Sequence, residues 1–139
     1  MADLPHRIEI VPWGFWKSVT GLNGRSQASS NLGGGSLFLT ANPNSVTWEV
    51  LLDAGTWALD VIYGASSDRA IFDFLIDGSS IGTVDAYAAT LTRNVAAAIT
   101  GITLAAGHHV LRIAANGKNA ASADYFLTPF TLTLTRTGA

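Results

Sequence analysis

The chain has 139 residues, of which 48% are hydrophobic and only 13% are charged, so it has enough apolar material for one domain with a sizeable core. The formal net charge of −2 leaves no electrostatic footprint for nucleic acid or for an acidic membrane surface. Cysteine is absent, which excludes disulfides, thiolate metal sites and cysteine nucleophiles.

The first 35 residues differ in composition from the rest. We expect a strand at Arg7–Val11 and an aromatic segment at residues 13–16, followed by a long loop, because residues 20–35 consist mainly of Gly, Ser and Asn. A structureless run of this length is functional or mobile, so residues 21–35 are either an arm that orders on a partner or a disordered segment. Residues 36–139 are predicted to form the folded domain, which residues 7–11 join.

Apolar residues alternate with period two along most of residues 36–139, which is typical of β-strands. The expected strands are Leu37–Thr40, Val46–Leu52, Trp57–Tyr63, Ala70–Ile76, Ile81–Asp85, Ile99–Leu104, His108–Ala114 and Phe130–Arg136. The strand at Ala70–Ile76 is apolar on both faces, so we expect it to be central or covered by a neighbouring subunit. Residues 86–98 are rich in alanine, and their threonines favour an extended connection over a helix.

Turn signals separate these strands. Asp77-Gly78 supplies the positive φ angles that a tight hairpin turn demands. Two segments, Leu52–Val61 and Leu104–Ile113, share an Ala-Gly turn followed by an apolar strand, and we interpret them as two equivalent hairpins. The pattern predicts an all-β fold: a two-sheet antiparallel sandwich of the jelly-roll type with a loop-rich N-terminal segment.

A membrane-spanning segment is not expected. Residues 94–111 carry no formal charge and approach the length of a spanning helix, but a turn signal at Ala106-Gly107 interrupts them. The N-terminal residues also lack the apolar core of a signal peptide.

No motif for catalysis stands out in the sequence. Glu9 and Glu49 lie in the middle of expected strands among apolar neighbours, where an outward, solvated position is simpler than the cleft that a glycosidase needs. His108 and His109 are adjacent on a strand and therefore point to opposite faces, so they cannot share one metal ion. We predict no enzyme activity, no catalytic residue and no metal or cofactor site.

One alternative to the absence of a metal is a calcium site. Aspartates in loops can supply the oxygen ligands that calcium prefers. The candidates are Asp73, Asp77, Asp85 and Asp124, although Asp77 has a sufficient local role as a turn former.

The aromatic residues are the candidate contact residues for a partner or a glycan. Trp48 and Trp57 alternate with aliphatic residues and are expected in the core. Outside that pattern, a large rigid apolar face can stack on a sugar ring or anchor an interface. The candidates are Trp13, Phe15, Trp16, Tyr87 and Tyr125; the alternative for the two tryptophans is that they plug the open end of the sandwich.

Two segments resemble jelly-roll proteins of tailed-bacteriophage virions: residues 55–87, with Ile71-Phe-Asp-Phe-Leu-Ile-Asp-Gly78, and the tail at residues 117–138. The resemblance implies a capsid decoration (cement) protein, or another head or tail accessory, that stabilises the shell through protein–protein contacts. The expected partners are then the major capsid protein or another virion protein, together with copies of the chain itself in a trimer or dimer. Its expected location is the virion, assembled in the host cytoplasm. The surface, rich in Thr, Ala and Gly, suits such contacts, or is simply that of an ordinary β domain.

The same core is similar to carbohydrate-binding modules. Leu104-Ala-Ala-Gly-His-His-Val-Leu-Arg-Ile113 resembles a hairpin of these modules, and Phe74-Leu-Ile-Asp-Gly78 resembles the strand before their turn. This resemblance implies the alternative function: a module of a virion or of a cell-surface enzyme that binds a glycan or a receptor.

Overall fold

The computed structural model describes residues 6–10, 18–20, 27–29, 34–36 and 44–139. The predicted strand at Leu37–Thr40 and the aromatic segment at Trp13–Trp16 lie outside the described residues. No helix in the described part of the chain is long and apolar enough to cross a membrane.

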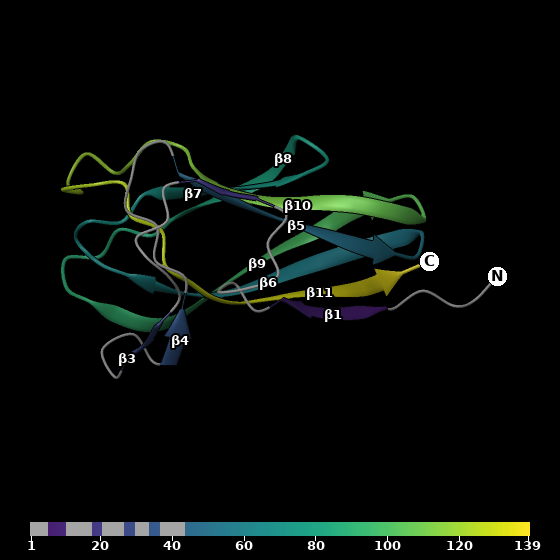
Figure 1. The fold of residues 1–139 in the computed structure, drawn as a ribbon, viewed down its shortest axis with the longest axis horizontal. Helices are drawn as coiled ribbons and strands as arrows, with labels where there is room; N and C mark the ends of the chain where they lie inside the picture. The colour runs from purple at the N-terminus through teal and green to yellow at the C-terminus, as the bar shows by residue number, and fades with distance from the viewer. Residues whose placement is uncertain (1–5, 11–17, 21–26, 30–33, 37–43) are drawn as a thin grey trace.

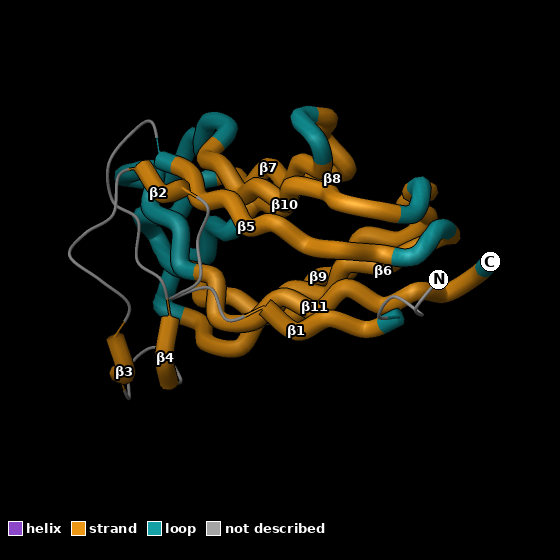
Figure 2. Tube along the Cα trace, turned by 45° about the vertical axis from the view of Figure 1, so that its right-hand side comes forward, coloured by secondary structure: helices purple, strands orange, loops and turns teal. Residues whose placement is uncertain are grey.

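Eleven strands make up the described secondary structure. They are β1 (Arg7–Ile10), β2 (Ser18–Thr20), β3 (Gln27–Ser29), β4 (Gly34–Ser36), β5 (Ser45–Leu52), β6 (Gly55–Ala65), β7 (Ile71–Ile76), β8 (Ser79–Asp85), β9 (Thr92–Leu104), β10 (Gly107–Ala115) and β11 (Pro129–Gly138). One sheet has the order β1-β11-β6-β9 and the other the order β2-β5-β10-β7-β8, while β3 and β4 pair separately. Figure 2 shows the two larger sheets as stacked layers. The predicted all-β antiparallel sandwich is confirmed.

The alternating residues of both sheets form the core between the layers. Trp48 on β5 is 2% exposed and Trp57 on β6 is fully buried, as predicted. Phe72 and Phe74 on β7 are also fully buried, and their rings contact each other at a centroid distance of 6.0 Å. Each inward residue removes its apolar surface from water, which stabilises a side chain of this size by about 1.5–3 kcal/mol.

Strand β7 is central, as its two apolar faces predict. It lies between β10 and β8, and its outward residues are only partly exposed. Pairing on both sides leaves no free edge on this strand.

The two Ala-Gly segments are not hairpins, so that interpretation was wrong. The turn before Gly55 carries the chain from β5 in one sheet to β6 in the other, and the turn before Gly107 carries it from β9 to β10. The register pairs Gly55 with Leu104 and Gly107 with Leu52. The two segments are therefore equivalent as connections between layers, because each strand finds its partner in the other segment rather than across its own turn.

Two further segments differ from expectation. Residues 92–98, predicted as an extended connection, form the first half of β9 because β6 supplies a hydrogen-bonding partner along them. Residues 27–29 and 34–36, inside the predicted loop, pair with each other as β3 and β4. Neither segment has the apolar alternation by which a strand is recognised in sequence.

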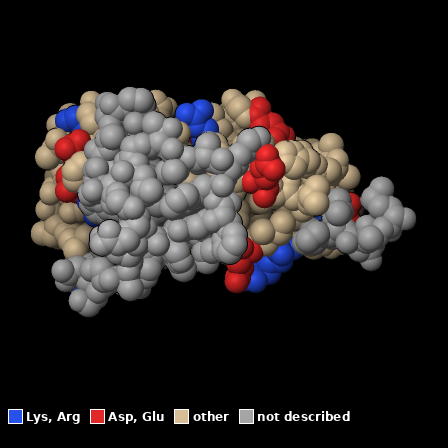
Figure 3. Space-filling view, viewed as in Figure 1, with Lys and Arg blue, Asp and Glu red and all other residues tan. Residues whose placement is uncertain are grey.

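The sandwich has two distinct ends, which position its candidate sites. The turn end holds the short connections at residues 53–54, 77–78 and 105–106, and lies to the right in Figure 1 together with the C-terminus. The loop end, at the left of the figure, holds the connections at residues 66–70, 86–91 and 116–128. Charged side chains on the face in Figure 3 lie in small scattered groups rather than in one patch.

Candidate functional site

The loop end differs from the rest of the described structure in the exposure of its aromatic side chains. Of the aromatic residues whose exposure is described, only Tyr87, Tyr125 and Phe126 are partly exposed, and all three lie at the loop end. The others are buried: Trp48, Trp57, Tyr63, Phe72 and Phe74. The loop end therefore offers the aromatic surface that the described sequence can present to a ligand.

One connection, residues 66–70, holds in place the segment around Tyr87 and the segment around Phe126. On one side, the Ser66 N–H donates to the Ala86 carbonyl at 3.2 Å, and the Ala88 N–H donates to the Ser66 carbonyl at 3.0 Å. On the other side, the Phe126 N–H donates to the Asp68 carbonyl at 3.0 Å. Tyr87 and Phe126 consequently flank the same connection.

A buried arginine anchors this connection to the core. Arg69 is 3% exposed; its guanidinium pairs with Asp68, and its Nε donates to the Thr128 hydroxyl at 2.9 Å. The Thr128 hydroxyl in turn donates to the Gly64 carbonyl at 2.9 Å. Burial lowers the pKa of Arg69 while Asp68 opposes that shift, so the partners compensate for a charge that would otherwise be costly to bury.

Ser122 joins the connection at residues 116–128 to the connection at residues 66–70. Its hydroxyl donates to the Arg69 carbonyl at 2.7 Å, and the Ala123 N–H donates to the Ser67 carbonyl at 2.8 Å. Each of these bonds joins backbone segments that are far apart in sequence. Together they fix the backbone that carries the aromatic rings.

Polar groups lie beside the aromatic residues. The carboxylate of Asp85 accepts from the Tyr87 N–H at 3.0 Å and from the Asn119 side-chain amide at 2.8 Å. The Lys118 ammonium lies 5.6 Å from the centroid of the Tyr125 ring, within reach of a cation–π interaction. Burial raises the pKa of Tyr63, and the nearby Asp85 carboxylate adds to that shift.

Tyr125 is also held from below. Its N–H donates to the Asp124 carboxylate at 2.9 Å, and its carbonyl accepts from the Asn44 side-chain amide at 2.9 Å. Asn44 is 2% exposed, and its Oδ1 atom has no hydrogen-bond partner. Tyr125 packs against the core cluster and Tyr87 does not. The Tyr87 side chain is therefore part of the surface only.

The aspartates proposed as alternative calcium ligands do not gather in one place. Asp77 lies at the turn end, Asp73 bonds to Ser80 at 2.5 Å, and both oxygens of Asp85 already accept hydrogen bonds. Within the described ranges, no three His, Asp or Glu side chains come together as metal ligands. The described residues do not fit a calcium site built from these four carboxylates.

The two adjacent histidines point to opposite faces, as predicted. His108 is exposed and pairs with Glu49 at 3.2 Å, whereas His109 is 7% exposed and pairs with Asp77 at 2.6 Å. Glu9 and Glu49 are exposed, in the outward positions that the sequence predicts.

The structure brings two of the five predicted contact residues, Tyr87 and Tyr125, to the same end of the sandwich; Trp13, Phe15 and Trp16 lie outside the described residues. Sequence reasoning missed Phe126 and Asn119. The adjacent aromatic pair Tyr125-Phe126 was a usable signal, since two aromatic neighbours on an extended segment cannot both face the core.

Comparisons with known proteins show similarity in fold. Part of the xanthan lyase of Paenibacillus superposes with a TM-score of 0.75 and 20% identity, over 98% of this chain and 14% of that chain. The carbohydrate-binding module CBM36, solved with calcium and xylotriose, gives a TM-score of 0.64 and 18% identity over 93% of this chain and 98% of that chain. The module CBM6cm-2 of Cellvibrio mixtus lichenase 5A, solved with cellotriose, gives a TM-score of 0.64 and 16% identity over 94% of this chain and 97% of that chain. No protein-family model and no curated protein matches the sequence.

The fold is thus the jelly roll of carbohydrate-binding modules. At the level of the fold, these structures match the resemblance to carbohydrate-binding modules and not the resemblance to virion proteins. Fold similarity at this level of identity does not by itself define a function.

Proposed function

We propose that this chain is a non-catalytic carbohydrate-binding module that binds a neutral β-linked glycan at the loop end. The observation that carries the proposal is that Tyr87, Tyr125 and Phe126, the partly exposed residues among the aromatic residues whose exposure is described, all lie at this end. Backbone hydrogen bonds hold the segments that carry them. Its full-length similarity to modules solved with xylotriose and cellotriose supports the ligand class.

The chemistry of the loop end suits a sugar. An aromatic ring can lie against the apolar face of a pyranose with little ordering cost, because a tyrosine side chain has only two rotatable angles. The amide of Asn119 and the carboxylate of Asp85 lie beside Tyr87 and can exchange hydrogen bonds with hydroxyl groups. The negative charges of Asp68, Asp85 and Asp124 at this end are offset by Arg69 and Lys118, which suits an uncharged glycan.

The first test is the substitution Tyr87→Ala, with binding to xylotriose and cellotriose measured by isothermal titration calorimetry. We expect the affinity to fall about tenfold or more, as a lost contact of about 1.4 kcal/mol requires. The thermal midpoint should change little because Tyr87 lies outside the core cluster. Tyr87→Phe should keep most of the affinity, since the ring remains.

The matched control is Leu51→Ala, which removes an exposed apolar side chain from a sheet face instead of the loop end. If Tyr87→Ala binds both sugars as well as the unaltered chain does, the loop-end proposal is wrong. Trp13→Ala and Trp16→Ala test the remaining predicted contact residues in the same assay. Repeating the titration with EDTA tests the calcium alternative, since a binding site that depends on calcium would lose its affinity for the sugar.

A further inference from the structure

Strand β9 is an unusual sheet edge. It is 13 residues long and, among the described strands, pairs only with β6. An edge strand presents unpaired N–H and C=O groups, which natural proteins protect with charges, prolines or short length. Among the other edges, β2 has three residues, β1 carries Arg7 and Glu9, and β8 is seven residues long and ends on Asp85. Strand β9 carries its one charged residue, Arg93, near its start. Residues 94–104 of β9 include no charged residue and no proline.

The register shifts of β9 are symmetric about Ala97. The pairing with β6 is regular from Val95 to Ile99 and shifts register beyond each end of that stretch. Positive φ angles mark both shifts, at Asn94 (+53°) and at Gly101 (+72°). A twofold axis at Ala97 in an antiparallel pair would set Val95 against Ile99 of a second copy, so that the regular stretches pair and each register shift faces the other shift of the second copy.

We propose that two copies of this chain form a twofold-symmetric dimer by antiparallel pairing of their β9 edges about Ala97. Ala96 and Ala98 are exposed, and their small side chains leave the facing rows of the two copies uncrowded on that side of the sheet. The hydrogen bonds continue the sheet across the axis, from four strands to eight. An interface that uses the same surface of both copies closes on itself and stops at two.

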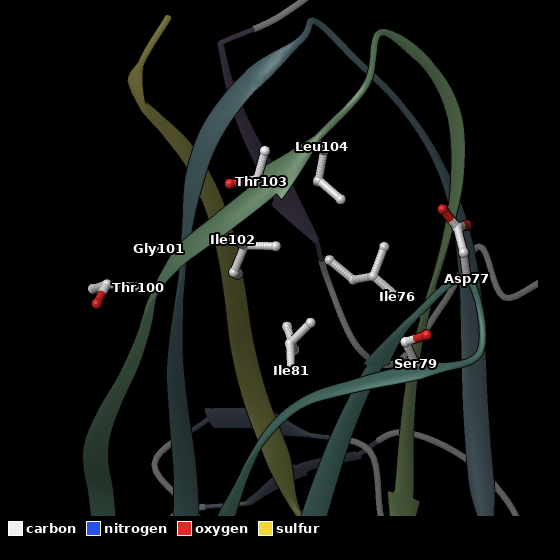
Figure 4. Close-up of a pocket in the computed structure, with 9 residues that line it drawn as sticks. All are labelled: Ile76, Asp77, Ser79, Ile81, Thr100, Gly101, Ile102, Thr103 and Leu104. Carbon is white, nitrogen blue, oxygen red and sulfur yellow. The ribbon is translucent and has the colours of Figure 1, made fainter.

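The same register gives an exposed leucine a partner surface. Leu91, just before β9, is one of two large apolar side chains that are exposed among the residues whose burial is described, at 43%. Counting from the axis places it opposite Thr103 of the second copy. Thr103 borders a pocket of about 310 Å³ between β8 and β9 (Figure 4), whose apolar residues are Ile76, Ile81, Ile102 and Leu104. Cross-strand neighbours share one face of a sheet, so Leu91 of the second copy would pack beside Thr103 on the exposed outer face, whereas Ile102 and Leu104 face the pocket.

A charge-swap experiment tests the dimer. Ala96 of one copy and Ala96 of the other lie diagonally across the proposed axis, about 7–8 Å apart. We expect the unaltered chain to show a monomer–dimer equilibrium in sedimentation at concentrations up to about 500 µM. Ala96→Lys and Ala96→Glu alone should each weaken the dimer at least about tenfold, and an equimolar mixture of the two should restore it.

The control is Thr131→Lys. Thr131 is exposed on β11 and lies in the same row of the sheet, since Ile62 pairs with both Thr131 and Ala96. This variant adds the same charge two strands from the edge and should dimerise normally. Thermal midpoints establish that every variant is folded. A chain that stays monomeric throughout the concentration range, a dimer that tolerates Ala96→Lys, or a mixture that fails to restore association would each overturn the proposal.

Discussion

The pair formed by His109 and Asp77 predicts a specific pH dependence of stability. Nδ1 of His109 lies 2.6 Å from the Asp77 carboxylate, and Nε2 lies 2.7 Å from the Ala105 carbonyl. A carbonyl cannot donate a hydrogen bond, and an ionised carboxylate cannot either. Both ring nitrogens must therefore carry a proton, which makes His109 a buried cation that joins β10, the β7–β8 turn and the β9–β10 connection.

The pKa shifts agree with this geometry. Burial lowers the pKa of His109, but the bonds to Ala105 and Asp77 outweigh it, and the pKa rises above its ordinary 6.5. The hydrogen bond from the Val110 N–H lowers the pKa of Asp77 below its ordinary 3.8, and the hydrogen bond with His109 lowers it further. The histidine contributes fully below its unfolded pKa, and its contribution is lost as pH rises through the folded one. The aspartate contributes above its unfolded pKa, and its contribution is lost as pH falls through the folded one. The pair is therefore most stabilising between about pH 4 and 6.5.

Substituting His109→Gln removes the cation and leaves one hydrogen bond at most. A bond to a charged group contributes about 1.5–3 kcal/mol, so we expect a loss of about 2 kcal/mol at about pH 5.5. At about pH 9.5, where the unaltered histidine has lost its proton, the difference should fall below about 1 kcal/mol. For a domain of this size, 2 kcal/mol corresponds to roughly 6–10 °C in thermal midpoint.

Urea denaturation followed by tryptophan fluorescence measures these differences, because Trp48 and Trp57 are buried. The control is His108→Gln, since His108 and Glu49 are both about half exposed and an exposed pair contributes about 0–1 kcal/mol. A stability difference between the unaltered chain and His109→Gln that is equal at both pH values would refute the assigned cation. So would a larger difference at the higher pH.

Three other substitutions test the contacts that hold the fold together. Arg69→Met should lower the free energy of unfolding by about 2–4 kcal/mol in urea, because Thr128 loses its donor and Asp68 its partner; a neutral result would mean that the guanidinium does not anchor the loop end. Gly55→Ala should cost about 3 kcal/mol or more, because a Cβ there would clash with the Gly138 carbonyl and the Arg136 Nε. Gly101→Ala, where the space is open, should cost only about 1–2 kcal/mol for its left-handed backbone, and equal costs in thermal or urea unfolding would contradict this account.

The sequence by itself determined the strands of the core and which of their residues face inward. Alternation is a local property that follows from the two-residue period of the strand, so the inward positions of Trp48 and Trp57 are readable without a structure. The turn at Asp77-Gly78 is local too, since its geometry depends on residues with positive φ angles, and the structure has them at both positions.

Only the tertiary structure decided how the strands pair. The turn before Gly55 has the chemistry of a hairpin turn, yet it joins two layers, because the partner of β6 is β9, about 40 residues away in sequence. Residues 92–98 form a strand for the same reason, since their hydrogen-bonding partner comes from β6 and not from their own apolar pattern.

The candidate site also depended partly on the sequence and partly on the tertiary structure. Tyr87 and Tyr125 stood out because they fall outside the apolar alternation, but nothing local placed them at one end beside Phe126. That placement depends on hydrogen bonds from residues 66–70 to two distant segments. Long-range contacts of this kind are specified by the packing of the whole chain, and a single sequence does not state which residues they join.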